Sequence, residues 1–173
     1  SVADILRAKE AGRQVAFINY QYLPDDVTLS YLEWSREQGV RMAGLTYNNP
    51  NPVGVGCTQA VDSGITAFGA EVIARMNGLG MLVDVSHAGK RTTLDACRRS
   101  TAPVIASHTG AEALYGHPRN KSDDELAAIA DSGGVIGVYA APFLLAESKP
   151  VSVETMVDHI AYNVHDIDDG VEA

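Results

Sequence analysis

The chain has 173 residues, enough for one domain with a proper core, and its 46% hydrophobic and 20% charged residues are ordinary for a globular protein. Its formal net charge of −9 at pH 7 argues against nucleic acid and anionic membrane surfaces as partners. The two cysteines, Cys57 and Cys97, belong to no CxxC or Cys/His cluster, which favours free thiols in a reducing compartment over a structural disulfide.

We expect neither a membrane segment nor an export signal in this sequence. No stretch approaches the roughly 18 apolar residues that a membrane-spanning helix needs, so we expect no membrane segment. Charged residues interrupt the N-terminal segment, which therefore does not resemble a signal peptide, and we expect a cytoplasmic protein. That segment reads as the middle of a helix, as though the natural chain began earlier. The sequence is compatible with a homodimer but does not decide the oligomeric state.

In chain order, the first part of the sequence alternates helix and strand patterns. Gly12 and Gly39 end helical patterns as C-terminal caps do, and apolar, β-branched runs indicate buried strands. The predicted elements are a helix over 2–11, a strand over 14–19, a helix that opens at 24–26 and a strand over 40–45. Residues 46–64 show no period and contain several Asn, Pro and Gly, which predicts a long loop of the kind that often carries function.

The alternation continues through the rest of the chain. Thr66 is a predicted N-cap, and Ser122 with Glu125 predicts a capping box, in which two side chains satisfy free backbone amides. The predicted elements are helices over 66–77, 90–99, 122–131 and from 152 onward, a helical turn over 111–115, and strands over 81–85, 103–106 and 135–138. In the last helix, apolar residues recur with helical spacing, as in an amphipathic helix: Val153, Met156, Val157, Ile160, Ala161 and Val164.

Strict alternation of helices with continuous apolar strands predicts an α/β protein with a parallel sheet covered by helices. Two architectures fit, an open doubly wound sheet and an arc of a (β/α)8 TIM-type barrel. No Gly-rich nucleotide motif follows any strand, whereas polar residues at several strand tips favour the barrel: Asn19, Thr46, His87 and His108. A whole barrel needs about 250 residues. We therefore expect a single domain over 1–173 that forms the central part of a barrel, with both ends missing.

Two predicted strands end on the same dipeptide. Ser86-His87 follows the strand over 81–85, and Ser107-His108 follows the strand over 103–106. Neutral imidazole is the commonest zinc ligand, and adjacent parallel strands bring both rings to one mouth of a barrel. Hydrogen-bonded loop histidines are the alternative.

Other residues near these strand ends carry possible chemistry. Arg119 suits a substrate carboxylate through a bidentate fork, or it is a surface arginine paired with Asp123 or Asp124. Asp84, inside a strand, either orients a metal ligand or makes a purely structural hydrogen bond. Tyr47 either donates to a developing oxyanion or packs on the barrel rim.

The remaining histidines invite simpler interpretations. We expect His117 to be a structural loop residue. We expect His159 and His165 to be solvent-exposed residues on or after the last helix.

Taken together, the motifs resemble those of the membrane (renal) dipeptidase family of zinc metallopeptidases, over roughly residues 39–160. The resemblance is carried by the segments Leu79-Gly-Met-Leu-Val-Asp-Val-Ser-His87, Ala102-Pro-Val-Ile-Ala-Ser-His108, His117-Pro-Arg-Asn120, Ser122-Asp-Asp-Glu-Leu126 and Gly133-Gly-Val-Ile-Gly137. Gly44-Leu-Thr-Tyr-Asn48 is similar to the bacterial branch of the family.

The resemblance implies a (β/α)8 barrel with a two-zinc centre that cleaves dipeptides. By motif position, His87 and His108 correspond to the two histidine ligands of one zinc ion, and Arg119 to the arginine that holds the substrate. Tyr47 stands where the animal enzymes have a histidine near the scissile carbonyl, which implies a catalytic and substrate-binding role.

The sequence departs from the family pattern at three places. The His-x-Asp pair for the other zinc and the later proton-handling aspartate have no counterpart here. The bridging glutamate should lie near the end of the strand over 14–19, where the sequence reads Phe17-Ile-Asn-Tyr-Gln21 without an acid. We expect Asn19 in this place, or another residue if the alignment shifts by two. The sequence therefore does not decide whether the site holds one zinc ion or two.

Three functions compete. The first is a zinc-dependent dipeptidase in the full-length form, and the second is a one-metal barrel hydrolase of another small substrate, such as an N-acyl amino acid, lactone or phosphoester. The third is a non-catalytic fragment or degenerate homologue, because two histidines fall short of the three protein ligands typical of catalytic zinc. The chain by itself is expected to be inactive.

Overall fold

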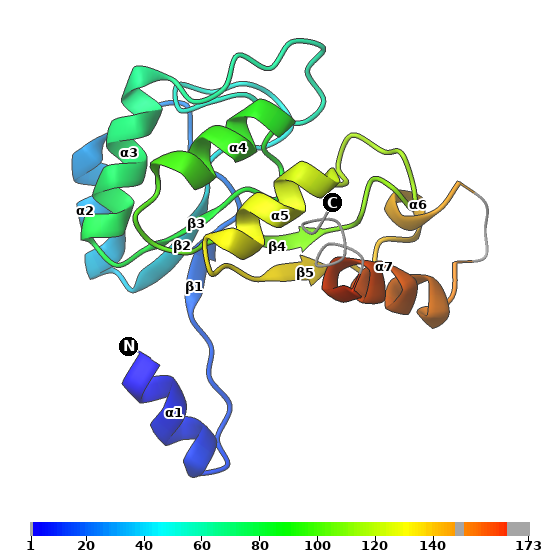
Figure 1. Ribbon diagram of the computed structural model, residues 1–173. Coiled ribbons are helices and arrows are strands. Elements are labelled where there is room, and N and C mark those ends of the chain that lie inside the picture. Colours follow the sequence, from blue (N-terminus) through cyan, green and yellow to red (C-terminus); the bar gives the residue numbers. More distant parts are fainter. Residues whose placement is uncertain (1, 148–150, 166–173) are drawn as a thin grey trace.

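A computed structural model describes residues 2–147 and 151–165. Its centre is one sheet of five strands in the order β1-β2-β3-β4-β5, and every neighbouring pair is parallel (Figure 1). The strands are β1 (Ile18–Tyr20), β2 (Val40–Gly44), β3 (Leu82–Asp84), β4 (Val104–Thr109) and β5 (Ile136–Val138). The helices are α1 (Val2–Glu10), α2 (Leu29–Glu37), α3 (Ala67–Gly78), α4 (Lys90–Arg99), α5 (Asp123–Asp131), α6 (Pro142–Leu145) and α7 (Val153–His165).

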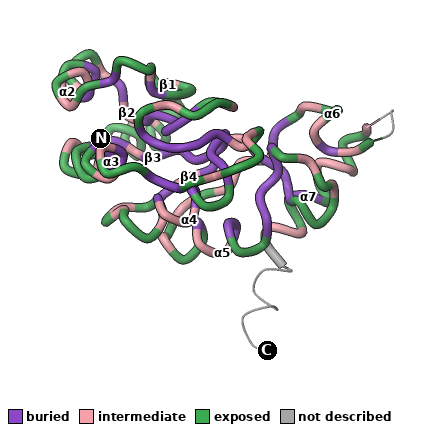
Figure 2. The backbone as a smooth tube through the Cα atoms, turned by 90° about the horizontal axis from the view of Figure 1, so that it is seen from above, coloured by how far each residue is buried: buried purple, intermediate pink, exposed green. Residues whose placement is uncertain are grey.

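Because strand order follows chain order, each connection crosses over the same face and lays its helix there. Helices α2, α3, α4 and α5 lie side by side on that face (Figure 1). The core fills the space between these helices and the sheet, with Leu32, Met76, Val83 and Val104 among its fully or almost fully buried members. Figure 2 shows the buried segments concentrated along β2, β3 and β4. The predicted parallel α/β architecture is therefore confirmed.

Local hydrogen bonds explain several of the predicted helix starts. The Thr66 hydroxyl accepts from the backbone N–H of Gly69 at 2.8 Å and begins α3. The Glu125 carboxylate reaches back to the backbone N–H of Ser122 at 3.0 Å, which completes the predicted capping box of α5. These interactions need only residues three positions apart, so the sequence reveals them directly.

Several elements differ from expectation. The strand expected over 14–19 is confined to Ile18–Tyr20, because residues 14–17 precede the point where β2 begins to pair. The helix expected from 24–26 starts only at Leu29, where the Thr28 hydroxyl accepts from the N–H of Tyr31 at 3.1 Å. The short helix α6 was not expected at all.

The burial of α7 also differs from expectation. Three of its apolar side chains are exposed: Val153 (72%), Val157 (52%) and Ile160 (47%). His159, expected at the surface, is instead 1% exposed. Its Nδ1 accepts from the N–H of Ala111 at 2.9 Å, and its Nε2 lies 3.1 Å from the carbonyl oxygen of Leu145. Helix α7 packs on β5, the edge of the described sheet, and on α6, and these contacts leave the three apolar side chains partly in solvent.

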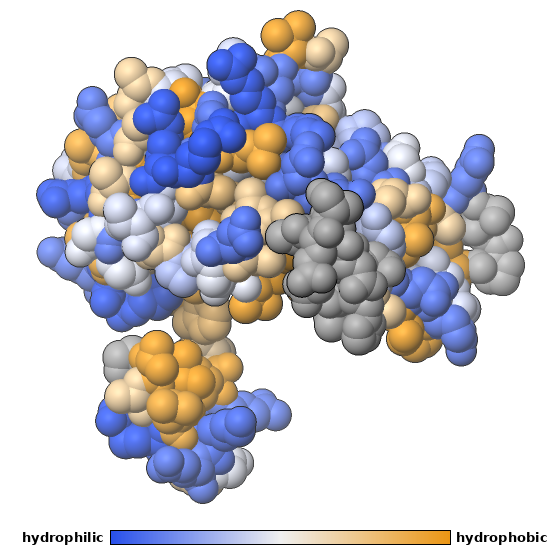
Figure 3. Space-filling view, viewed as in Figure 1, coloured by the Kyte–Doolittle hydropathy of each residue, from blue (hydrophilic) through white to orange (hydrophobic). Residues whose placement is uncertain are grey.

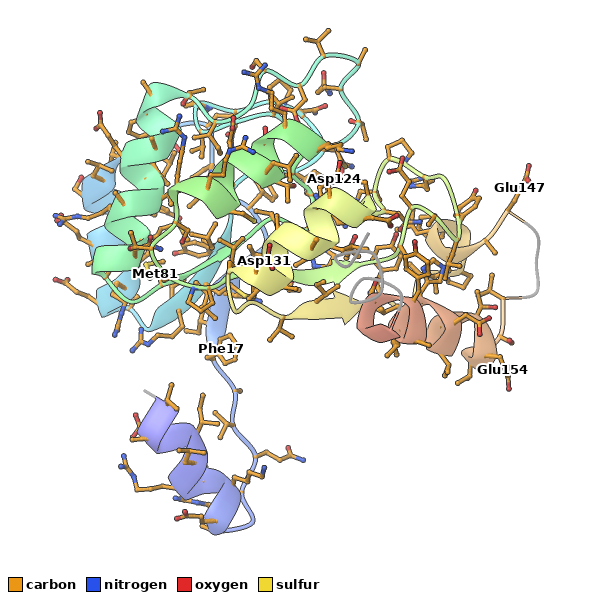
Figure 4. The ribbon with its side chains drawn as sticks, in the orientation of Figure 1. Phe17, Met81, Asp124, Asp131, Glu147 and Glu154 are labelled. Atoms are coloured by element: carbon orange, nitrogen blue, oxygen red, sulfur yellow. The ribbon has the colours of Figure 1, made fainter. Side chains whose placement is uncertain are left out.

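Helix α1 stands apart from the sheet (Figure 1) and buries none of its residues. The apolar side of α1 faces the sheet in Figure 3. A hollow of about 540 Å³ lies between α1 and the N-terminal ends of β1, β2 and β3. Phe17, on the connection from α1 to β1 (Figure 4), is 53% exposed at this hollow. In the described part of the chain, no helix is both long and apolar enough to cross a membrane.

Candidate metal centre

The two Ser-His dipeptides meet at the C-terminal ends of β3 and β4. These strands pair in parallel, with Val83 opposite Val104. The Nε2 atoms of His87 and His108 consequently lie 2.9 Å apart. His87 is 6% exposed, and His108 is the penultimate residue of β4, which runs further than the sequence indicated. The geometry therefore brings together the two side chains that the sequence singled out first.

Asp84 lies beneath the pair and binds both serines. Its Oδ1 accepts from the backbone N–H and hydroxyl of Ser86, at 2.9 and 2.5 Å, and from the N–H of Ser107 at 3.2 Å. Its Oδ2 accepts from the hydroxyl of Ser107. Asp84 is 2% exposed, so these donors compensate for the burial of its charge. Of the two roles considered for Asp84, the structural hydrogen bonds are present, and they fix the strand tips that carry the histidines.

Each imidazole also has a partner on its other nitrogen. Nδ1 of His87 lies 2.8 Å from Oδ1 of Asn48, and Nδ1 of His108 lies 2.8 Å from the hydroxyl oxygen of Ser107. Burial, helped by the positive charge of Arg119, lowers the pKa of His87 to about 3. Burial also lowers the pKa of His108, although the Asp84 carboxylate opposes this effect. Both rings are therefore neutral at pH 7, the state in which imidazole binds metals.

Arg119 lies directly beside the histidines. It is 6% exposed, and its guanidinium donates to the carbonyl oxygens of Ser86 and, at 3.3 Å, His108. The surface alternative is wrong, because Asp124 pairs instead with Lys90 at 2.9 Å and lies at the start of α5 (Figure 4). His117 accepts from the N–H of Arg119 at 3.1 Å, which confirms its structural role in the loop.

Tyr47 stacks on the outer side of His87. The two ring centroids are 4.3 Å apart, and the ring of Tyr22 lies 5.1 Å from that of Tyr47 on the other side. Tyr47 is 40% exposed. It packs on the rim, as one interpretation expected, and it does so in contact with the histidine pair.

Of the two amide residues at the end of β1, Gln21 and not Asn19 lies beside the histidines. Nε2 of Gln21 lies 3.5 Å from Nε2 of His87, whereas Asn19 is an exposed member of β1 that pairs with Met42. Gln21 lies two residues after Asn19, which is the shift that the sequence analysis allowed for this position. At Gly44, a Cβ atom would lie 2.1 Å from the carbonyl oxygen of Gln21, so only glycine lets the two strand tips approach this closely. The sequence could have indicated that Gln21 lies at the site. Gln21 comes shortly after the C-terminal end of β1, as His87 comes shortly after the C-terminal end of β3.

Two further residues of the site were missed. In the sequence, Asn48 stood out only as one residue of the predicted loop over 46–64, with no role of its own. Lys121 is 1% exposed and donates to the carbonyl of Ala88 and the hydroxyl of Thr93, both at 2.7 Å, and to Glu125 at 2.9 Å. It thereby ties the segment after His87 to α4 and α5. A lysine next to a predicted helix start is typical of the protein surface, and no sequence pattern indicates that Lys121 is buried.

The donor chemistry of this site suits zinc only in part. Two neutral imidazoles whose Nε2 atoms face one another are a suitable pair of ligands, and their facing lone pairs repel unless a cation lies between them. However, residues 2–147 and 151–165 contain no group of three or more His, Cys, Asp and Glu side chains that could hold a metal ion. The described chain therefore provides two ligands of a set that needs at least one more.

Comparison with known proteins decides the family. The sequence profile described as membrane dipeptidase (peptidase family M19) matches residues 1–167. The chain belongs to the membrane dipeptidase family. It is 37% identical over 137 residues to an uncharacterized protein of Klebsiella pneumoniae encoded in the pqqA 5′ region, covering 73% of this chain and 51% of that one. It is also 37% identical over 143 residues to an uncharacterized dipeptidase of Schizosaccharomyces pombe, covering 79% and 34%.

A solved structure of similar sequence has the same fold. An amidohydrolase from Pseudomonas aeruginosa superposes with a TM-score of 0.86 at 36% identity, over 95% of this chain and 50% of that chain. The chain thus spans about half the length, or less, of the relatives it matches. Together with the parallel strand order, this confirms the expected arc of a TIM-type barrel.

Proposed function

We propose that the full-length protein is a zinc-dependent dipeptidase whose metal centre includes His87 and His108. The observation that carries this proposal is the 2.9 Å approach of their Nε2 atoms at the C-terminal end of the parallel sheet, where barrel enzymes hold their active sites. Bound zinc would supply Lewis acidity, lowering the pKa of water and polarising a carbonyl oxygen. Membership of a family of dipeptidases supports the reaction class.

In this proposal, Arg119 positions the substrate. A guanidinium has five N–H donors, and the contacts to Ser86 and His108 use two of them. The remaining donors can bind the C-terminal carboxylate of a dipeptide through a charge-assisted pair. Since Arg119 is held by the same strand tips as the histidines, the carboxylate and the scissile carbonyl would be fixed at a constant separation.

Tyr47 contributes from the rim of the site. Its ring stacks on His87, so its hydroxyl, carried by a 40% exposed side chain, can reach a substrate beside the histidines. We assign this hydroxyl the role of a donor to the negative charge that develops on the carbonyl oxygen.

The identity of Gln21 favours one metal over two. An amide oxygen is a neutral donor, whereas a bridge between two cations needs the negative charge of a carboxylate. A one-metal site would also suit another small amide or ester, such as an N-acyl amino acid, lactone or phosphoester, and this is the second candidate function. Zinc analysis of the full-length protein separates the two: one zinc per chain favours the second candidate, and two favour the dipeptidase.

The test of function uses the natural full-length protein loaded with zinc. We expect hydrolysis of members of a panel of L,L- and L,D-dipeptides, loss of activity in the His87→Ala variant, and a raised KM in Arg119→Lys. Tyr47→Phe should lower kcat about 10- to 1,000-fold with little effect on KM, since its hydroxyl acts mainly on the transition state.

A suitable control is Asn49→Ala, because Asn49 lies two residues beyond Tyr47 and is exposed. If the panel stays intact and His87→Ala leaves every measured activity unchanged, the dipeptidase proposal is wrong.

A further inference from the structure

The partners of His87 define which of its nitrogens carries a proton. The contact on one side is Oδ1 of Asn48, at 2.8 Å from Nδ1. A carbonyl oxygen can only accept, so Nδ1 must be the protonated nitrogen. The contact on the other side is Nε2 of Gln21, at 3.5 Å from Nε2 of His87, and an amide nitrogen can only donate. Both contacts therefore require the same tautomer, with a proton on Nδ1 and a lone pair on Nε2.

Asn48 is itself held in place by the long loop. Its backbone carbonyl accepts from the hydroxyl of Thr58 at 2.8 Å and from the side-chain amide of Gln59 at 3.4 Å. The thiol of Cys57 lies 3.8 Å from the same Oδ1 that faces His87. The loop over 46–64 thus delivers one amide oxygen to one imidazole nitrogen.

His108 has a corresponding support made of different groups. The hydroxyl proton of Ser107 goes to the Asp84 carboxylate, so the Ser107 oxygen is left to accept from Nδ1 of His108, 2.8 Å away. This arrangement also leaves Nε2 of His108 on the side of His87. Two unrelated supports therefore direct the Nε2 atoms of both histidines to one point, 2.9 Å apart, where one metal ion can bind both.

We infer that Asn48 is a positioning residue that fixes His87 as its Nδ1–H tautomer and so prepares Nε2 for a metal ion. The metal part of this inference rests on the proposed zinc centre. The tautomer part does not, because it follows from hydrogen bonds in the protein alone. A hydrogen-bond acceptor on the far nitrogen of a ligating histidine raises the affinity of the site, and its loss typically costs 10- to 100-fold in metal binding.

The decisive experiment is long-range ¹H–¹⁵N NMR of the imidazole groups in ¹⁵N-labelled, metal-free protein at neutral pH. We expect Nδ1 to be the protonated nitrogen of His87 and Nε2 to be unprotonated. Asn48→Leu keeps the shape of the side chain and removes the acceptor, so His87 should change to the Nε2–H form while His108 stays the same. Asn48→Asp restores an acceptor and should restore the Nδ1–H form.

Metal binding provides the second readout, measured as competition with a chromogenic zinc chelator. We expect Asn48→Leu to weaken zinc binding about 10- to 100-fold and Asn48→Asp to recover it. Asn49→Leu is the matched control, because Asn49 is the next residue, is exposed, and accepts from the side-chain amide of Gln59 at 3.3 Å rather than facing the histidines. It should change neither the tautomer nor the affinity.

The outcomes separate this inference from the proposed function. An Nε2–H tautomer in the unsubstituted protein overturns the inference without any variant, even if Asn48→Leu fails to fold. An unchanged Nδ1–H tautomer in a folded Asn48→Leu variant also overturns it. The expected tautomers with no zinc binding in any variant would instead refute the metal centre and leave the role of Asn48 in orienting His87 intact.

Discussion

The ammonium group of Lys121 and the carboxylate of Glu125 form an ion pair of 2.9 Å inside the protein, with the two side chains only 2% and 5% exposed. Lys121→Met keeps the length of the side chain and leaves Glu125 as an uncompensated buried charge. We expect this change to lower the free energy of unfolding by about 3–5 kcal/mol. Urea unfolding followed by circular dichroism measures the loss.

The exposed pair of Lys90 and Asp124 is the matched comparison, since its side chains are 54% and 72% exposed. Lys90→Met should cost about 1 kcal/mol or less, because solvent screens the interaction. Adding Glu125→Gln to Lys121→Met should recover part of the loss, as the amide no longer carries an unpaired charge. Equal losses of unfolding free energy in Lys121→Met and Lys90→Met would show that the buried ion pair stabilises the protein no more than the exposed pair does.

Asp84→Asn tests the support beneath the histidines. The substitution removes the charge that four donor groups of Ser86 and Ser107 share, and we expect it to cost about 1.5–3 kcal/mol of unfolding free energy. It should also weaken zinc binding, because both strand tips lose their common anchor. Asp131→Asn, at the exposed end of α5 (Figure 4), should change stability by no more than about 0.5 kcal/mol. Similar behaviour of the two variants would contradict the role given to Asp84.

The stability of the metal-free protein should fall as the pH drops below 6.5. His87 has its pKa lowered from 6.5 to about 3, so between these values the unfolded chain binds a proton that the folded protein does not. Stability from this group is therefore fully present above pH 6.5 and is lost on going towards pH 3, by at most about 1.4 kcal/mol per pH unit. Guanidinium unfolding of the unsubstituted protein and His87→Gln across this range measures the difference. If the unfolding free energies of the two proteins change in parallel with pH, the lowered pKa of His87 is refuted.

Both thiols should react slowly with alkylating reagents at pH 8. Burial raises the pKa of Cys97 to about 11, and burial also raises the pKa of Cys57. Since only the thiolate is nucleophilic, Cys97 should have roughly a thousandth of its molecules in reactive form at pH 8. The rate of iodoacetamide labelling, resolved by mass spectrometry of each peptide, should rise about tenfold per pH unit. Rapid labelling of native Cys97 at pH 8 would show that its surroundings are more open than the structure has them.

Much of the fold was predictable because its signals are local. Apolar runs, Thr66 and the Ser122–Glu125 capping box depend on residues within one turn or one strand, and each lies where the sequence placed it. The histidine pair was predictable for a similar reason. Two parallel strands that each end on Ser-His must bring the two rings to the same edge of the sheet.

The missed features depend on tertiary neighbours. His159 looks like a surface residue on a helix, and only the approach of Ala111 and Leu145 provides the partners that allow it to be buried. Lys121 likewise needs Ala88, from a distant part of the chain. The register of Gln21 depends on an irregularity between Ile18 and Asn19 in the pairing of β1 with β2, which no periodic pattern reveals.

The order β1-β2-β3-β4-β5 has a consequence for how the protein is made. Within the described sheet, each strand after β1 pairs with the strand immediately before it in the chain, so these pairings do not wait for a more distant segment to be synthesised. Each such pairing closes only the segment between two consecutive strands, which costs less chain entropy than a pairing between the two ends of the chain. The sheet can therefore grow in one direction at the ribosome, and the histidine pair forms as soon as β4 docks on β3.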